Sequence, residues 1–556
     1  MATAKAKIII NGQSINPYFV TIRQGSSWHH SFEIGVSTEK LESENAFTID
    51  NSIALVGKSA EIAIEPSNFS NGDNLNFKGL VTSVQIDRSY AGENIIVLKG
   101  QSPSFLLEDG IGTRSFTKKT LKAIVNEVLK PYPKNELNPE VNPAYTTEIP
   151  YIVQYKETNF HFLNRIAAIY GEWFFYNGQS LIFGKPPKGS SVDVTLGSDL
   201  ISFDYGVRVR PSKFKYQSYD YEQNKVIENS SNSIKPGWLD NYGKKALSAS
   251  DAIFKSEHVN PLSFDVRDES LQKHLAKVRK STILSDTTFF KGTSNNPSIA
   301  VGGGVGVNAV KVVGKNKSST FIGRFRVLTV IHRLNASKDY LNEFEAIPIS
   351  AAIPPGNSRI FKPEAESQIA VVKENNDPDK LGRVRVQLPW QTGSEMTPWI
   401  RIVTNYASKD RGLYFVPEIG DEVYVDFEQG NPDRPYMLGA HYHGKKKPQW
   451  ADPDNNLKAI KTRSGHMILF DDKDGNEMIT IVDKKNNHII LNAKDESITI
   501  SAPKKMVLES TEIEINGKDI SITASNKLEE KGKNVTVQAQ QKIAMIRDMV
   551  AEQDSK

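Results

Sequence analysis

Short apolar stretches rich in β-forming residues dominate the first 105 residues. They lie at 7–10, 19–23, 53–65 and 95–99, and turns rich in Asn, Gly and Ser separate them. Stretches of this length between turn residues are typical of strands, because each is too short for a stable helix and too apolar for a loop. This part of the chain is therefore predicted to be an all-β domain.

Two segments show the helical period instead. Thr120 can cap a helix over 121–130, whose apolar residues fall on one stripe. Thr158 or Asn159 can begin a second helix, and Gly171 can end it. We expect two helices here.

A hairpin is predicted directly after the second helix. Asn177-Gly178 joins the stretches 173–176 and 180–183, and this dipeptide is a strong signal for a two-residue hairpin turn. From about 200 to 350 the pattern is again mostly β, apart from a charged helical run near 269–280.

A linker and a compact β segment follow. Residues 351–368 contain three prolines and one glycine, a composition typical of linkers. From 369 to about 444, turn signals recur every 8–12 residues, which is the spacing of a small barrel.

Beyond Lys458, pairs of apolar residues that flank a single residue recur at short intervals. Their first members lie 10, 9, 8, 7, 7 and 15 residues apart, and polar linkers separate them. The pairs are Ile479/Ile481, Ile489/Leu491, Ile498/Ile500, Met506/Leu508, Ile513/Ile515, Ile520/Ile522 and Val535/Val537. Such short periods indicate a β-solenoid, because each unit is a strand too small to form a core alone.

The oligomeric state follows from this repeat. Each turn of the rod offers only two inward side chains, so several identical chains wound about one axis enclose a dry core more readily than one chain. We predict an intertwined rod with the pairs made of Ile, Leu and Val facing its axis: Ile479, Ile481, Ile489, Leu491, Ile498, Ile500, Ile513, Ile515, Ile520, Ile522, Val535 and Val537. Ordinary hairpins on a β-sandwich are the alternative.

Length, charge and composition narrow the functional classes. A chain of 556 residues suggests three to four domains. The net charge of +4 is too small for phosphate-driven binding, so nucleic acid is not expected as a partner. Without Cys there is no disulfide, thiolate or Cys-ligated metal. We expect neither a signal peptide, since the first apolar run has three residues, nor a transmembrane segment.

Candidate chemistry is sparse, and no cofactor is expected. His441 and His443 are two residues apart on a predicted strand, so three chains could offer six ring nitrogens to an axial metal. The lysines at 445–447 argue against a bound cation, and exposed imidazoles are the favoured interpretation. The run 471–475 resembles a calcium loop in composition, but its ligand order is wrong and Asp474-Gly475 is a hairpin signal. A spatial Ser-His-Asp triad has no support in the sequence.

The most specific pattern lies in the predicted barrel. It begins at 371–390, VVKENNDPDKLGRVRVQLPW, and ends at 430–443, GNPDRPYMLGAHYH. Within it, turn residues precede alternating strands at 383–388 and 422–427. The motif residues are Asp377, Pro378, Leu381, Gly382, Arg383, Pro389, Trp390, Gly420, Asp421 and Glu422. This block resembles the oligonucleotide/oligosaccharide-binding (OB) barrel of VgrG proteins, the spikes of type VI secretion and related contractile injection systems.

The resemblance extends over most of the chain. Residues 464–481 resemble the start of the family's triple-stranded β-helix, and 153–176 and 323–348 are similar to its hub. The implied fold is mainly β and multidomain: a hub over 1–350 with two β-barrel domains and a small α+β insert around 115–185, a linker over 351–368, an OB-fold barrel over 369–444, a trimeric β-helix needle over 459–540 and a tip segment over 541–556.

The resemblance also implies a mechanical function. The protein would be a homotrimer that docks on a hexameric inner-tube protein, contacts baseplate proteins, carries a PAAR-type tip protein and non-covalent effectors, and punctures a target membrane. It would assemble in the bacterial cytoplasm and then be ejected. A spike of a phage-like tail or extracellular contractile particle is the nearest alternative.

An enzyme is not expected. Only about 15 residues separate the barrel from the repeat, too few for the lysozyme domain of some phage spikes. After Val537 only 19 residues remain, too few for a fused toxin, and a short helix at 543–550 is expected to help seat the tip. A cell-wall glycan hydrolase and a passive trimeric adhesin are the alternatives from other classes.

Overall fold

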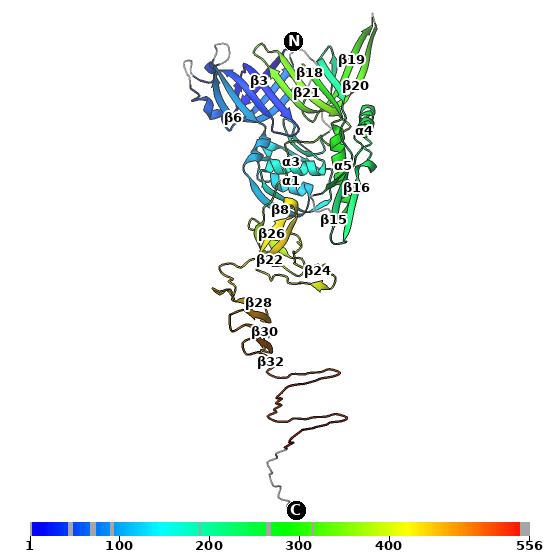
Figure 1. The fold of residues 1–556 in the computed structure, drawn as a ribbon. Coiled ribbons are helices and arrows are strands. Elements are labelled where there is room, and N and C mark those ends of the chain that lie inside the picture. The colour runs from blue at the N-terminus through cyan, green and yellow to red at the C-terminus, as the bar shows by residue number, and fades with distance from the viewer. Residues whose placement is uncertain are drawn as a thin grey trace, which may run out of the picture. The chain divides into compact units, whose positions relative to one another are not determined.

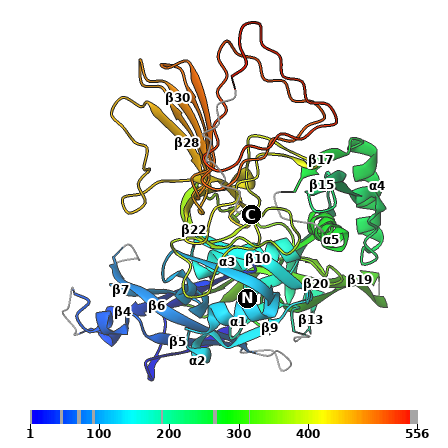
Figure 2. The same cartoon turned by 90° about the horizontal axis from the view of Figure 1, so that it is seen from below.

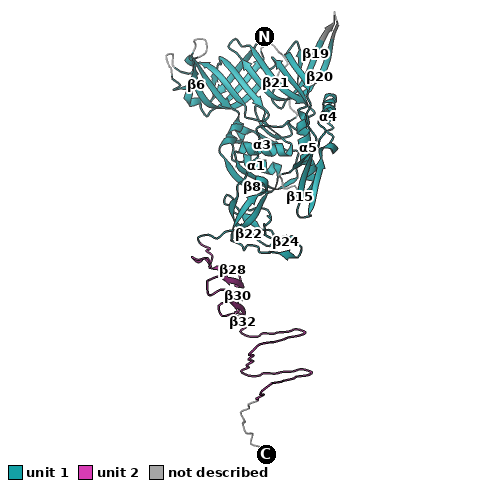
Figure 3. Ribbon diagram, viewed as in Figure 1, with its two compact units in different colours: residues 1–444 teal, residues 445–556 magenta. Residues whose placement is uncertain are grey.

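The computed structural model describes residues 3–42, 48–66, 74–88, 94–187, 191–262, 268–313 and 316–544. The chain divides into two compact units, Met1–Gly444 and Lys445–Lys556 (Figure 3). In the described part, no helix is both long and apolar enough to cross a membrane. Most of the expected helix at 543–550 lies outside the described residues.

A continuous 13-stranded sheet forms the top of the first unit in Figure 1. Its strands, in spatial order, are β19 (Gly304–Val313), β13 (Ser191–Leu196), β14 (Leu200–Val207), β18 (Thr288–Ser294), β21 (Tyr340–Pro348), β20 (Asn316–Leu334), β3 (Phe19–Gly25), β4 (Ser31–Ser37), β7 (Ile95–Gln101), β6 (Leu75–Asp87), β5 (Ser59–Pro66), β1 (Ala4–Ile10) and β2 (Gln13–Ile15).

The long strand β20 organises this sheet. Its first half pairs with β19, and its second half pairs with β21 and β3. The β19–β20 pairing closes six strands, β19-β13-β14-β18-β21-β20, into a barrel, and the remaining seven strands continue from β3 as a second lobe. Two separate cores fill the two lobes. The barrel core stacks Phe290 on Phe325, and the core of the second lobe extends into the helices below it.

An α+β insert packs under this sheet (Figure 2). Its elements are β8 (Gly112–Thr120), α1 (Leu121–Leu129), α2 (Lys134–Leu137), β9 (Pro139–Asn142), β10 (Glu148–Glu157), α3 (Asn159–Tyr170), β11 (Trp173–Tyr176) and β12 (Leu181–Gly184). The predicted helix caps are confirmed: Thr120 accepts from the Ala123 amide, Thr158 accepts from the His161 amide, and Gly171 ends α3 with φ +78°. The predicted hairpin is confirmed as β11–β12.

A second insert lies between β14 and β18. It contains β15 (Phe214–Asp220), β16 (Lys225–Ser230), α4 (Asn241–Ile253), β17 (His258–Pro261) and α5 (Glu269–Ser285). The helical run expected near 269–280 is confirmed as α5 and continues to Ser285. The sequence did not predict α4, because its buried stripe consists of Gly243, Ala246 and Ser250, which carry little apolar signal. The described residues of this unit also form the 3₁₀ turns η1 (Thr38–Lys40), η2 (Ser52–Leu55), η3 (Pro103–Glu108), η4 (Ser231–Ser233) and η5 (Glu428–Gly430).

A small β domain closes the first unit. Its sheet has the order β23 (Arg385–Gln387), β22 (Gln368–Glu374), β26 (Glu422–Phe427) and β27 (Pro435–Ala440), and a short hairpin adds β24 (Ala407–Ser408) and β25 (Arg411–Gly412). Isolated bridges from Val384 to Ile400 and from Ile402 to Met437 connect its two ends, so the sheet closes around an apolar core. The predicted strand 422–427 is confirmed, whereas the strand predicted over 383–388 is shorter, because the chain bridges to Ile400 before β23 begins.

The second unit is an antiparallel meander. It consists of β28 (Leu457–Lys461), β29 (Met467–Asp471), β30 (Met478–Val482), β31 (His488–Asn492) and β32 (Ser497–Ser501), each paired with the next. Residues 502–544 are described without a helix or a strand. The last apolar pairs of the repeat therefore lie outside the strands of this single chain.

Candidate functional site

Apolar side chains form two columns on one face of the second unit. The strand register places Ile468 opposite Ile481, Ile481 opposite Ile489, and Ile489 opposite Ile500. In the second column each residue likewise lies opposite the next, in the order Phe470, Ile479, Leu491 and Ile498. Directly opposite residues share a face of the sheet, so the six predicted inward residues from Ile479 to Ile500 lie on a common face. We call these two columns the apolar ladder.

The apolar ladder is uncovered in a single chain. Ile479 and Ile489 are each 37% exposed, and the exposure rises to 70% at Ile498. The opposite face is more polar, since Thr480 and Thr499 flank Ile490 across the strands. A sheet with one exposed apolar face and one mixed face needs a cover for the apolar side.

The repeat continues beyond the last strand. Met506, Leu508, Ile513, Ile515, Ile520, Ile522, Val535 and Val537 are between 48% and 70% exposed. The register of β30 to β32 thus brings six of the predicted inward residues together, and the single chain leaves the other six apart. A lone strand needs a ladder partner, which one chain does not supply here.

The turns of this unit are held by side-chain acceptors. Asp483 accepts from the amides of Lys485 and Asn487, at 2.8 and 3.0 Å. In the run 471–475, whose composition resembles a calcium loop, Asp471 accepts from the Lys473 amide, and Gly475 adopts φ +67°. These contacts are those of β-turns, and the described residues contain no cluster of three or more His, Cys, Asp or Glu side chains suited to a metal.

Asp377 organises the barrel motif. Its Oδ2 accepts from the backbone amides of Leu381 and Arg383, at 2.9 and 3.2 Å, and Gly382 between them adopts φ +72°. The Arg383 guanidinium donates to both carboxylate oxygens of Asp377, at 2.8 and 3.0 Å. Both side chains are 3% exposed. Burial alone would raise the pKa of Asp377, but the hydrogen bonds from Arg383 outweigh it and hold that pKa at about 2.

The remaining motif residues also shape the backbone. The Trp390 indole donates to Gln368 Oε1 at 3.0 Å, while Pro389 before it is exposed. Gly420 has φ +88°, and Asp421 Oδ2 accepts from the Glu418 amide at 2.9 Å. These contacts build turns and strands and do not assemble a catalytic group.

Glu222 is a partner of this motif that sequence reasoning missed. Its Oε1 accepts from Arg383 Nη1 at 2.6 Å, and the Tyr221 hydroxyl lies 3.3 Å from the same nitrogen. The pair connects the β15–β16 hairpin to the barrel. An acidic turn residue far away in sequence gives no signal of this contact.

His441 and His443 do not gather further ligands. The His441 amide donates to the Glu422 carbonyl at 3.0 Å, and its ring stacks on Tyr424 with 5.1 Å between centroids. Both side chains are partly or fully exposed. Within the described part of one chain, no third metal-ligating side chain joins them.

One Ser-His-Glu chain of contacts does occur in the hub. Ser104 Oγ lies 2.9 Å from His29 Nδ1, and His29 Nε2 lies 3.0 Å from Glu108 Oε1. This order of groups could activate a serine nucleophile. Ser104 is only 1% exposed, however, and its hydroxyl also contacts Ser102 at 2.8 Å. A substrate carbonyl cannot reach it, so we interpret the contacts as a structural network.

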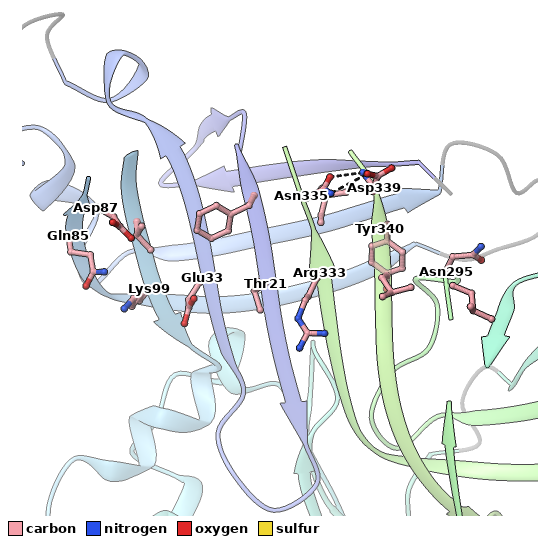
Figure 4. A pocket seen from close by; sticks show the side chains of 15 residues that line it. Thr21, Glu33, Gln85, Asp87, Lys99, Asn295, Arg333, Asn335, Asp339 and Tyr340 are labelled. Atoms are coloured by element: carbon pink, nitrogen blue, oxygen red, sulfur yellow. Dashed lines mark hydrogen bonds between the residues drawn. The ribbon is translucent and has the colours of Figure 1, made fainter. Parts of the chain in front are cut away.

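A polar depression lies on the outer face of the sheet where the two lobes join (Figure 4). Its volume is about 550 Å³. Arg333, Thr21, Glu33 and Lys99 lie opposite one another across β20, β3, β4 and β7. Charges of opposite sign alternate along this row, and none of the residues singled out from the sequence lines the depression.

Two family models match the chain. The model of the phage tail baseplate hub matches residues 30–337, which is more than half of the 556 residues. The chain belongs to the phage tail baseplate hub family. A second model, of the type VI secretion system/phage-baseplate injector OB domain, matches residues 368–442, the small β domain described above.

The relatives of this hub protein are VgrG spikes, which confirms the VgrG-type assignment and the mainly β, multidomain fold class. The type VI secretion system spike protein VgrG5 of Pseudomonas aeruginosa is 24% identical over 424 residues, covering 66% of this chain and 51% of the relative. The actin cross-linking toxin VgrG1 of Vibrio cholerae is 28% identical over 160 residues, covering 26% and 15%. The hub protein thus matches about half or less of the length of these relatives.

Solved structures show the same fold. The Escherichia coli c3393 protein, a component of the type VI secretion system with structural similarity to the T4 bacteriophage tail proteins gp27 and gp5, has a TM-score of 0.51 at 16% identity. That match covers 78% of this chain and 99% of the E. coli chain. A chain of the lidded Francisella PdpA-VgrG complex has a TM-score of 0.58 at 9% identity, covering 90% and 80%.

Proposed function

We propose that this VgrG-type hub protein is a homotrimeric spike whose three copies bury their apolar ladders against one another. This proposal is supported by the alignment of Ile481, Ile489 and Ile500 on one uncovered face of the sheet. Three such faces around one axis would enclose a dry core and leave the mixed faces in water. The pairs from Ile513 to Val537 would then find strand partners on neighbouring copies.

The energetics favour association of this kind. Burying an exposed Ile or Leu side chain stabilises by about 1.5–3 kcal/mol, and each strand of β30 to β32 contributes two such residues. Closing the winding also removes the free edges of β28 and β32, which otherwise present unpaired backbone groups. Separating the copies would have to break many ladder hydrogen bonds together, which suits a part under mechanical load.

The wider role rests on the family. We propose that the hub docks on a hexameric inner-tube protein within a baseplate, carries a PAAR-type tip protein and non-covalent effectors, and punctures a target membrane after assembly in the bacterial cytoplasm and ejection. The spike names of the curated relatives support this role. Because the OB model describes both type VI and phage-baseplate injectors, a phage-like contractile particle is the second candidate.

We further propose that the chain acts mechanically and is not an enzyme. Baseplate hub proteins are structural parts, and the Ser104 network is sealed from substrate. The cell-wall hydrolase alternative can be tested by incubating the purified protein with peptidoglycan and measuring released sugars; no release is expected.

The mass in solution tests the trimer. Light scattering after size exclusion should give about 186 kDa, three times the 62.0 kDa of one chain. A monomer at micromolar concentration would contradict the proposal, because the apolar ladder would then be covered within one chain or left in water.

A further inference from the structure

A groove opens in the first unit between α3, α5, the linker and the turn at 429–431. Its volume is about 670 Å³, which is in the range of ligand sites. Its walls are mostly aliphatic, and the main contributors are Ile169, Leu275, Val278, Ile283, Ile360 and Pro363. We call it the linker groove. It is separate from the apolar ladder, which lies in the second unit.

Two cations at the groove have no acidic partner among the described residues. The Arg279 guanidinium lies over the rings of Phe214 and Tyr216, 5.0 and 5.6 Å from their centroids, and its Nη1 is 3.4 Å from the Tyr216 hydroxyl. Lys362, on the linker, makes no ion pair or side-chain hydrogen bond with the described residues. Both side chains are exposed.

Arg165 is a third cation that lines the groove, and unlike Arg279 and Lys362 it has an acidic partner. It is neutralised by Glu157, with Nε and Nη2 donating to the two carboxylate oxygens at 2.8 and 2.7 Å. Arg279 instead is held in place by aromatic faces, which orient a guanidinium without satisfying its charge. A planar guanidinium in this state is suited to a bidentate carboxylate.

The rim also offers a free amide. Gln429 adopts a left-handed backbone with φ +55° and lines the groove. Its side chain makes no hydrogen bond with the described residues. An amide both donates and accepts, so it matches the N–H and C=O of a peptide, whereas an alkyl chain cannot use it. Glu364 is an acidic residue of the rim and disfavours ligands that carry several negative charges there.

We propose that the linker groove binds a short apolar peptide segment of a partner protein that ends in a carboxylate. Aliphatic side chains of the peptide fill the walls, its terminal carboxylate pairs with Arg279 and Lys362, and its backbone bonds to Gln429. This inference goes beyond the trimeric spike, because every group that it uses lies within the first unit of one chain.

The probe is a fluorescein-labelled peptide of sequence SGSILL with a free C-terminus, and fluorescence anisotropy with the full-length protein reports binding. The same peptide with an amidated C-terminus and the fatty acid dodecanoate serve as comparison ligands. Arg279→Gln should weaken binding about tenfold or more, because a charge-assisted hydrogen bond is lost. Thr282→Trp should abolish binding by filling the groove. Lys277→Gln, on the same helix but not in the lining, is the matched control and should bind as wild type does.

The outcomes are separable. The proposal is supported if the peptide with a free C-terminus binds the wild-type protein, if both groove variants lose this binding, and if the peptide with an amidated C-terminus does not bind. Equal binding to all variants, or a Kd weaker than about 1 mM, overturns it. Binding of dodecanoate without the peptide would identify a lipid-like ligand and overturn it too. Light scattering on the same samples separates this proposal from that of the trimer. A lower mass in solution for both groove variants would show that a second copy of the chain fills the groove instead of a partner peptide.

Discussion

Arg383 in the OB domain donates through Nη1 to Oε1 of Glu222, 2.6 Å away, although 161 positions separate the two residues. The same guanidinium is held by Asp377 on its other side, at 2.8 Å. One buried side chain therefore fixes the first turn of the OB domain and ties that domain to the β15–β16 hairpin. Removing one partner of such a pair strongly destabilises the fold, because the other charge stays buried without a partner.

Removing Arg383 should loosen the OB domain. Arg383→Ala leaves Asp377, which is 3% exposed, without its charge partner, and the expected cost is about 3–5 kcal/mol. Hydrogen exchange should show faster opening of the amides in β22 and β26, while the 13-stranded sheet keeps its protection.

Arg385→Ala is the matched control for this experiment. Arg385 pairs with Glu374 at 3.1 Å, but the two side chains are 26% and 42% exposed, so its loss should cost less than about 1 kcal/mol. Equal effects of the two substitutions would contradict the role given to Arg383.

A charge on the apolar ladder should prevent trimerisation. Ile500→Asp places three carboxylates around one axis, and a buried unpaired charge costs several kcal/mol. Thr499→Asp places the same charge on the opposite face of β32, where it stays in water. Light scattering should show a monomer for the first variant and a trimer for the second. A trimer from Ile500→Asp would refute the inward assignment.

Local signals in the sequence predicted much of this structure. The strand 422–427, the caps at Thr120 and Thr158, and the Asn177-Gly178 hairpin each depend on residues within a few positions, and each was found. The contact from Arg383 to Glu222 depends on how distant segments pack, so no local pattern reveals it. The periodic pairs predicted side chains that face a common core, and the register of β30 to β32 places six of them on one face, whereas the residues from Ile513 to Val537 form no strand in the single chain.

Acid should destabilise the hub through two buried histidines. Burial lowers the pKa of His30 to about 3, and the hydrogen bond to the Gly25 carbonyl offsets this only in part. Burial likewise lowers the pKa of His332 to about 3, with a further contribution from His30. Both pKa values lie below 6.5, the value of a histidine in the unfolded state. Between pH 3 and pH 6.5 the unfolded state therefore binds more protons than the folded state. Stability should fall by about 1.4 kcal/mol per pH unit for each histidine as the pH drops from 6.5 towards 3.

Urea unfolding at pH 7.5 and pH 5 measures this loss. His332→Gln should reduce the difference between the two pH values, because one of the two groups no longer takes up a proton on unfolding. His258→Gln, at an exposed position, should leave the difference unchanged. A difference that is the same in all three proteins would show that other groups set the acid sensitivity.

Asp433 should have the opposite pH dependence. Burial raises its pKa to about 6, although Arg165 and the Val153 amide, which donates to Oδ1 at 2.7 Å, lower it. Because the folded pKa lies above the unfolded one, Asp433 stabilises the fold below about pH 4, and this contribution is lost as the pH rises through 6. At pH 7.5 the buried Asp433 carboxylate is charged, and the nearby Glu157 disfavours that charge.

Asp433→Asn should therefore stabilise the protein at pH 7.5. The amide oxygen can still accept from Val153, while the desolvated charge is gone, so a gain of roughly 1–2 kcal/mol is expected. The gain should vanish near pH 4, where the wild-type carboxyl is already neutral. Thermal unfolding at the two pH values checks this, with Asp454→Asn as the exposed control. A loss of stability at pH 7.5 would mean that the attraction of Arg165 for the carboxylate outweighs its desolvation.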